Sequence, residues 1–122
     1  VMLVDDDQSM MSLLKTLLEL DGHSVITHAN PVTVLEKLAV EKPQVVIMDI
    51  KLKGGDGLSL LRAIRQTQDK VQMPVIMASG LDAKEECLLA GANDFVLKPY
   101  SPPVLMEMVA KVVSPQEQTQ ET

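Results

Sequence analysis

Cysteine, aromatic residues and positive charge are all scarce in this 122-residue sequence. Cys87 is the single cysteine, which rules out an internal disulfide and a zinc site built from cysteines. Phe95 and Tyr100 are the only aromatic side chains, so an exposed platform for stacking bases is not expected. The formal net charge of −6 disfavours direct nucleic acid binding, because gripping phosphates requires a clustered excess of lysine and arginine.

Long apolar runs are missing as well. No stretch has the length needed to cross a bilayer, and the start, Val1 to Val4 followed by three aspartates, does not resemble an export signal. With its lone cysteine, the sequence therefore predicts a cytoplasmic protein that has no membrane partner. The length and the hydrophobic fraction of 46% indicate one domain with an aliphatic core.

Strand-like and helix-like stretches alternate along the chain. From Ser9 to Leu20, Met10, Leu13, Leu14 and Leu17 recur at helical spacing and predict the first helix. Five strands alternating with five helices favour a parallel sheet with helices on both faces. Residues 1–113 are predicted to form this domain, and the polar residues 114–122 a frayed end or linker. The predicted strands cover residues 1–4, 24–28, 45–48, 74–78 and 94–97, and the last two helices cover about 83–90 and 102–113.

Polar residues follow the predicted strands at their carboxyl ends, which lie at one edge of a parallel sheet. These residues are Asp5, Asp6, Asp49, Ser79 and Lys98. Three carboxylates brought together repel one another unless a cation lies among them, and Mg²⁺ prefers such oxygen ligands. A hydroxyl and an ammonium beside a magnesium site supply what is needed to hold a phosphoryl group.

Taken in order, these residues resemble the receiver domains of bacterial two-component response regulators. The resemblance extends from Met2 to about Val113 and implies a flavodoxin-like α/β fold, a five-stranded parallel sheet in the order 2-1-3-4-5. The residues that carry it are Asp5-Asp6, Asp49 followed by Asp56-Gly57, Ser79 after Val75 to Ala78, and Gly91-Ala92 before Phe95 and Lys98-Pro99.

The resemblance implies a role for each residue of this group. Asp49 would accept a phosphoryl group from a sensor histidine kinase or a phosphotransfer protein. Asp5, Asp6, Asp49 and the backbone carbonyl of Lys51 would bind Mg²⁺, and Lys98 would pair with the phosphoryl oxygens. The domain would not be a turnover enzyme.

The resemblance also implies a switch and a partner. Ser79 would move toward the phosphoryl group and leave space into which Phe95 turns, although the sequence by itself favours Phe95 as a core residue. The Lys98-Pro99 peptide bond would be cis. The conformational change would control an output domain or partner protein, and a homodimer is one form that this control takes.

Two alternatives remain open from the sequence. The first is a Mg²⁺-dependent phosphatase or phosphotransferase that acts through an aspartyl phosphate. The second is a degenerate receiver that serves only as a protein-binding module. Asp7 is interpreted separately, as a strand-end or helix N-terminal charge.

The chain departs from the usual family pattern at three places. Lys53 lies where a proline is common, so the loop after Asp49 is predicted to be loose. Leu81 is apolar at a position that helps govern the access of water, which predicts a long-lived phosphoaspartate. The interval from Ser79 to Gly91 is shorter than usual by about one helical turn, roughly three residues. The fourth helix should therefore be short and the output surface unusual.

Overall fold

The computed structural model describes residues 1–67 and 73–121, with side chains up to residue 113. The main strands are β1 (Met2–Val4), β2 (Ile26–His28), β3 (Val46–Asp49), β6 (Val75–Ser79) and β7 (Asp94–Leu97). The helices are α1 (Gln8–Leu20), the 3-10 helix η1 (Pro31–Thr33), α2 (Val34–Glu41), α3 (Gly57–Gln66), α4 (Lys84–Leu89) and α5 (Pro102–Glu121). A separate ladder consists of β4 (Lys51–Leu52) and β5 (Gly55–Asp56).

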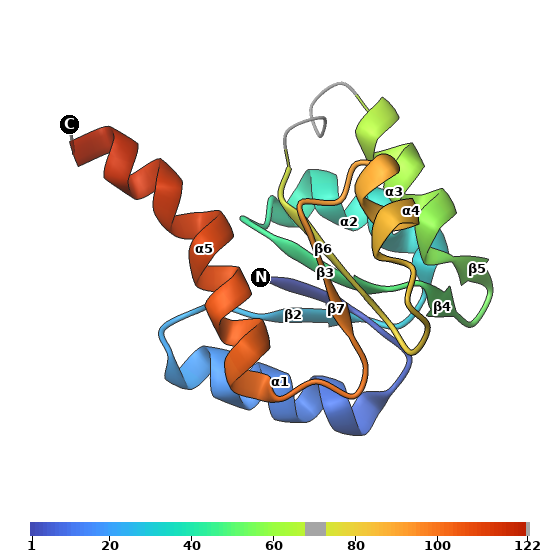
Figure 1. The fold of residues 1–122 in the computed structure, drawn as a ribbon, viewed down its shortest axis with the longest axis horizontal. Helices are drawn as coiled ribbons and strands as arrows, with labels where there is room; N and C mark the ends of the chain where they lie inside the picture. The colour runs from blue at the N-terminus through green and yellow to red at the C-terminus, as the bar shows by residue number, and fades with distance from the viewer. Residues whose placement is uncertain (68–72, 122) are drawn as a thin grey trace.

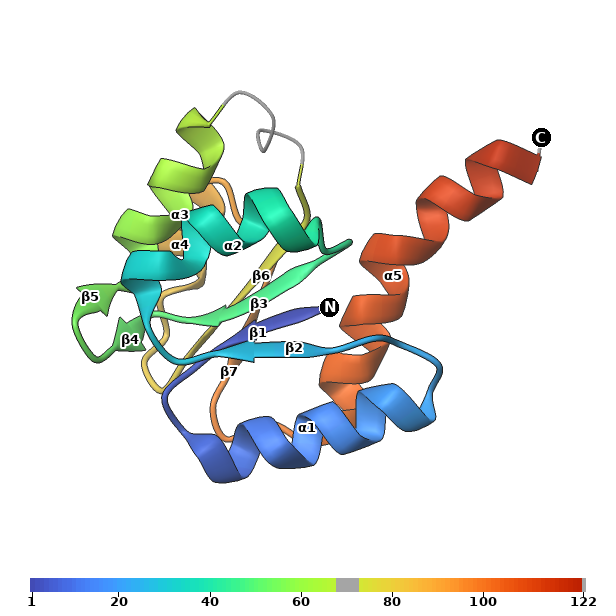
Figure 2. The same ribbon diagram turned by 180° about the vertical axis from the view of Figure 1, so that it is seen from behind.

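The five main strands form one parallel sheet in the order β2-β1-β3-β6-β7. Among the main strands this is the order 2-1-3-4-5, which confirms the predicted flavodoxin-like fold. Helices α1 and α5 cover one face of the sheet, and α2, α3 and α4 cover the other (Figures 1 and 2).

The central strands β1, β3 and β6 are apolar along most of their length because both faces of the sheet are covered there. Successive side chains of β1 show this: Met2 and Val4 pack with α2 and α3, whereas Leu3 packs with α1 and α5. Phe95 belongs to the α2 and α3 side and is 7% exposed, as the sequence alone favours.

The helix predicted from apolar spacing is α1, but that spacing does not mark its buried side. The helix buries Met11, Leu14 and Leu18, and of the four residues at helical spacing only Leu14 is among them. Leu13 is 47% exposed. Leucine and methionine occur on most sides of this helix, so apolar spacing alone does not determine which side meets the sheet.

The last two helices test the predicted boundaries. Helix α4, Lys84–Leu89, is short, as the interval before Gly91 predicts. Helix α5 was predicted to end near Val113, but it continues to Glu121. The prediction followed the apolar residues, whose spacing indicates which part of a helix is buried and not where the helix ends. Residues 114–121 are rich in Gln and Glu, which are good helix formers. Within the described residues, no helix is long and apolar enough to cross a membrane.

Candidate functional site

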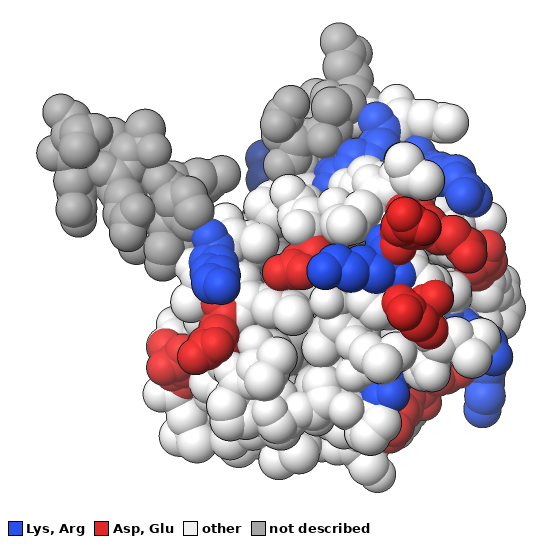
Figure 3. Space-filling model, in the orientation of Figure 1, with Lys and Arg blue, Asp and Glu red and all other residues white. Residues whose placement is uncertain are grey.

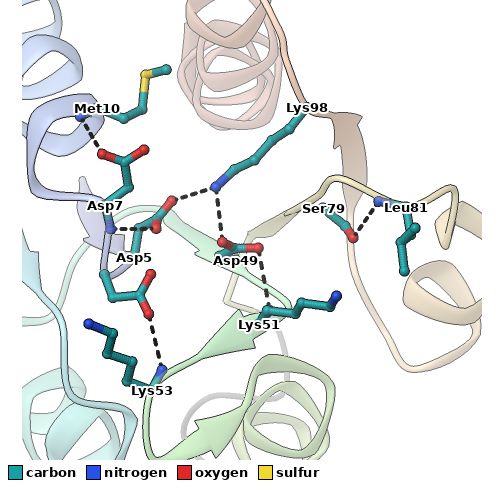
Figure 4. A network of polar contacts seen from close by, with 10 residues as sticks. Asp5, Asp7, Met10, Asp49, Lys51, Lys53, Ser79, Leu81 and Lys98 are labelled. Carbon is teal, nitrogen blue, oxygen red and sulfur yellow. Dashed lines mark hydrogen bonds and ion pairs between the residues drawn. The ribbon is translucent and has the colours of Figure 1, made fainter.

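The polar residues predicted to meet at one sheet edge do so because the strands that precede them are parallel. Asp49 is the last residue of β3 and pairs in register with Ala78. Ser79 ends β6 and pairs with Leu97, the residue before Lys98. Asp5 follows β1, the neighbour of β3 on its other side. Figure 4 shows the side chains of Asp5, Asp49 and Lys98 converging at the strand ends, whereas the Ser79 hydroxyl points toward Leu81.

Lys98 bridges two of the carboxylates. Its Nζ donates to Asp5 Oδ2 and to Asp49 Oδ2, each at 2.9 Å. The Lys98 side chain is 24% exposed and those of Asp5 and Asp49 are 13% and 12% exposed. Burial by itself lowers the pKa of Lys98, but the hydrogen bonds and charges of Asp5 and Asp49 outweigh it and raise the pKa. Lys98 therefore stays cationic between the two carboxylates.

Asp6 completes a group of three carboxylates. Ligand oxygens of Asp5, Asp6 and Asp49 lie within 4.8 Å of one another. One ammonium among three carboxylates leaves the group with two uncompensated negative charges. Oxygen ligands and this charge fit a hard divalent cation such as Mg²⁺.

Asp7 lies apart from this group, as its separate interpretation predicts. Its Oδ1 accepts the N–H of Met10 at 3.1 Å, so the side chain caps the N-terminus of α1. Its own N–H donates to Asp5 Oδ1 at 3.0 Å. The start of α1 therefore helps to hold Asp5 at the end of β1.

Ser79 is 3% exposed, and its Oγ accepts the N–H of Leu81 at 3.0 Å. The hydroxyl proton is therefore not used in this contact and remains available to an acceptor. Leu81 itself is 63% exposed. The Lys98-Pro99 peptide bond is cis, as predicted.

Comparison with known proteins identifies the family. Residues 1–110 match the response regulator receiver domain. The chain belongs to this family. It is 33% identical over 105 residues to the alkaline phosphatase synthesis transcriptional regulatory protein PhoP of Bacillus subtilis, covering 84% of this chain and 43% of that protein. It is 34% identical over 122 residues to the DNA-binding transcriptional regulator NtrC of Escherichia coli, covering 99% of this chain and 26% of NtrC.

This receiver domain also matches solved structures. The receiver domain of Francisella response regulator 1452 superimposes with a TM-score of 0.87 at 27% identity, covering 94% of this chain and 96% of that one. The N-terminal receiver domain of Klebsiella pneumoniae RstA gives a TM-score of 0.81 at 30% identity, covering 92% and 96%. The chain spans less than half the length of the curated relatives above.

The loop after Asp49 in this receiver domain contains a small hairpin that the sequence reasoning missed. β4 and β5 pair antiparallel, with Lys51 opposite Asp56. The two glycines before Asp56 were a signal for such a turn. The Lys51 side chain is exposed and extends away from Asp49 in Figure 4. In the part of the chain that the structure describes, it forms no ion pair with the carboxylates. Ligation by its backbone carbonyl stays a prediction.

Gly57 is required by a close approach that the sequence did not reveal. It is the first residue of α3, and its N–H donates to the Ile50 carbonyl at 2.7 Å. A Cβ on Gly57 would overlap the carbonyl oxygen of Asp49 and lie 2.8 Å from the Ile50 Cα. The glycine thus lets α3 begin directly against the backbone that carries Asp49.

Surface charge agrees with the low content of basic residues. On the face shown in Figure 3, acidic and basic side chains are interspersed over the described part of the chain. That face has no continuous basic surface of the kind that tracks nucleic acid phosphates.

Proposed function

We propose that this receiver domain accepts a phosphoryl group on Asp49 from a sensor histidine kinase or a phosphotransfer protein. An Asp49 carboxylate oxygen attacks the phosphorus of a phosphohistidine, and a P–O bond forms as the P–N bond breaks. The imidazole leaves with the electron pair of the broken bond and takes up a proton. The observation that carries the proposal is the Asp49 carboxylate at a strand end, held by Lys98 within a group of three carboxylates.

Each neighbouring residue has a distinct task in this proposal. Asp5, Asp6, Asp49 and the Lys51 carbonyl hold Mg²⁺, which supplies positive charge that offsets the charge of the phosphoryl group. Lys98 exchanges part of its contact with the carboxylates for a contact with the phosphoryl oxygens. Its raised pKa supports this task, since the ammonium is charged at any physiological pH.

Ser79 and Phe95 form the proposed switch. The Ser79 hydroxyl turns toward the phosphoryl oxygens, and Phe95, on the adjacent strand β7, moves into the space beside it. Phosphorylation needs only to favour one of two conformations through contacts that are better in that state. The domain is then a signalling module that undergoes phosphorylation and dephosphorylation at Asp49 without turning over another substrate.

The proposed switch acts on a partner through a surface of the receiver. We propose that residues 1–113 are the receiver and that residues 114–122 lead toward an output domain. The relative NtrC is named as DNA-binding, and by analogy a DNA-binding output domain is the partner that we favour. Because α4 has only six residues, we propose an output surface that differs from the usual one. A phosphorylation-dependent dimer formed through α4 would contradict that part.

Incubation with acetyl phosphate followed by intact-mass measurement tests the proposal. Wild-type protein and Asp7→Asn, in which asparagine still caps α1, should each gain one phosphoryl group with Mg²⁺ and none with EDTA. No gain in any condition would contradict phosphorylation and favour a protein-binding module. Sustained release of phosphate from a phosphomonoester would instead favour a phosphatase.

A further inference from the structure

A two-residue turn holds a backbone amide against the group of carboxylates. In the β4–β5 ladder Leu52 pairs with Gly55, so Lys53 and Gly54 form the turn between the strands. The N–H of Lys53 donates to Asp6 Oδ2 at 3.2 Å, although the two residues are 47 positions apart (Figure 4). This is a contact of the backbone and does not depend on the lysine side chain.

The geometry of the turn explains why this N–H is available. Gly54 has a φ of +84°, whereas Lys53 is not among the residues with positive φ. This combination matches a type II turn with Lys53 at its first central position, where proline is also well accommodated. The ladder pairs the flanking residues Leu52 and Gly55. The N–H of Lys53 is therefore directed to Asp6 rather than to the partner strand.

Both strands of the hairpin contact other parts of the fold. Its far strand packs on η1, where a Cβ on Gly55 would lie 2.7 Å from Pro31 Cγ. Its first strand is close to the site as well, since the N–H of Lys51 lies 3.4 Å from Asp49 Oδ1. The loop after Asp49 thus forms a paired hairpin, and its looseness stays a prediction.

We infer that the Lys53 amide is a positioning group for the Mg²⁺ site. It restrains the Asp6 carboxylate before a cation binds, in the way that hydrogen bonds to metal ligands generally orient them. The inference rests on the proposed function, because it takes Asp6 as a metal ligand. Every residue other than proline supplies this N–H, so the effect belongs to the backbone at position 53.

Two variants of Lys53 separate the effect of losing its backbone N–H from the effect of losing its side-chain charge. Lys53→Pro removes the N–H and suits the turn, whereas Lys53→Ala keeps it, and both remove the same positive charge. Titration calorimetry of unphosphorylated protein with MgCl₂ should give a dissociation constant about 3- to 10-fold higher for Lys53→Pro than for Lys53→Ala. The increase is smaller than that for losing a buried hydrogen-bond partner of a metal ligand, because the hydrogen bond from Lys53 is exposed. Equal constants would overturn the inference.

Hydrogen exchange of the wild-type Lys53 amide gives a second test that needs no variant. If the N–H favours Mg²⁺ binding, Mg²⁺ must in turn favour the hydrogen bond, so exchange should be slower with Mg²⁺ than with EDTA. Unchanged exchange would overturn the inference even if Lys53→Pro fails to fold. Wild-type protein that binds no Mg²⁺ would overturn both the inference and the proposed metal site. Failure to phosphorylate Asp49 would contradict the proposed function without altering the comparison of the two variants.

Discussion

The two ends of α3 meet polar clusters of different kinds. At the first residue, Gly57, the helix packs on the backbone of Asp49, beside three carboxylates and one ammonium. In the last turn, Arg65 donates from Nε to the Gly91 carbonyl at 2.8 Å and from Nη2 to Asn93 Oδ1 at 2.9 Å. One cluster lies at the carboxyl ends of the strands, and the other lies at the amino ends of β6 and β7.

The two clusters differ in the groups that they bring together. Asn93 Oδ1 also accepts the N–H of Val75 at 2.9 Å, and the Asn93 N–H donates to the Val75 carbonyl at 2.8 Å. The hydrogen bonds of Arg65 to Gly91 and Asn93, together with those between Asn93 and Val75, form a connected set that is suited to holding a loop in place. The carboxylate cluster keeps excess negative charge, which is costly in a partly buried site unless a ligand compensates it. The gathering of three carboxylates around one ammonium therefore distinguishes the proposed ligand site from the cluster around Arg65.

Among the proposed substitutions, the largest expected loss of stability comes from filling the close approach at Gly57. Gly57→Ala should lower the free energy of unfolding by about 3 kcal/mol, because the new Cβ would overlap backbone atoms that cannot easily shift. Urea denaturation measures the change. Gly80→Ala is the control, since a Cβ there meets nothing within 4 Å, and it should change stability by less than about 0.5 kcal/mol. Equal stability of the two variants would show that α3 does not depend on this contact.

Lys98→Met tests the charge balance of the carboxylate cluster. In EDTA it should lower the free energy of unfolding by about 2 kcal/mol, because Asp5 and Asp49 lose their cation. Saturating Mg²⁺ should recover part of this loss, since a divalent cation replaces the missing charge. Denaturation with and without Mg²⁺ measures both effects. A loss of the same size in the two conditions would argue that the cluster does not take a cation.

Arg65→Met is the matching change at the other end of α3. It should cost about 1 kcal/mol, because it removes the donor to the Gly91 carbonyl and to Asn93. The loss should be the same with Mg²⁺ and with EDTA. Arg62→Met, at an exposed position of the same helix, controls for loss of charge alone. If Mg²⁺ altered the effect of Arg65→Met, the distinction between the two clusters would fail.

The smallest expected effect is the pH dependence of stability that His28 contributes. It ends β2, and its Nε2 is buried without a hydrogen-bond partner among the described residues. Burial lowers the pKa of His28, with Lys37 acting in the same direction and Glu41 in the opposite one. Because the folded state resists protonation, stability should fall as pH drops below about 6.5, the unfolded value.

His28→Gln does not titrate and provides the comparison. Wild-type stability relative to this variant should decrease by a few tenths of a kcal/mol between about pH 7.5 and pH 5.5. Urea denaturation at the two pH values measures this difference. A difference that stays constant or changes in favour of the wild type would contradict the lowered pKa of His28.

The fold was largely predictable because the central strands β1, β3 and β6 are buried on both faces. Apolar stretches such as Val75 to Ala78 end abruptly at polar residues, and this pattern gave the strand positions and, with the family resemblance, their order. The end of α5 at Glu121 was predicted wrongly, and the buried side of α1, where Leu13 is exposed, was not predicted. These features depend on backbone hydrogen bonding and on which surface packs against the sheet. Apolar spacing encodes neither.

The candidate site was predictable in its membership but not in its contacts. Parallel strands bring Asp5, Asp49 and Lys98 to one edge, so the sequence order of these residues is sufficient to group them. The bridging of both carboxylates by Lys98 depends on side-chain positions that spacing does not specify. The Lys53 contact to Asp6 depends on the backbone path of a turn. The side chains at that turn carry no information about where its N–H points.

The central claim is that Asp49 is the phosphoacceptor, and the most direct test compares wild-type protein with Asp49→Asn. Both are incubated with acetyl phosphate and Mg²⁺, and the intact masses are measured. Asparagine retains the shape of the side chain but has no carboxylate to attack phosphorus. The account predicts one added phosphoryl group on the wild-type protein and none on the variant. Equal phosphorylation of both proteins, or no phosphorylation of either, would contradict it.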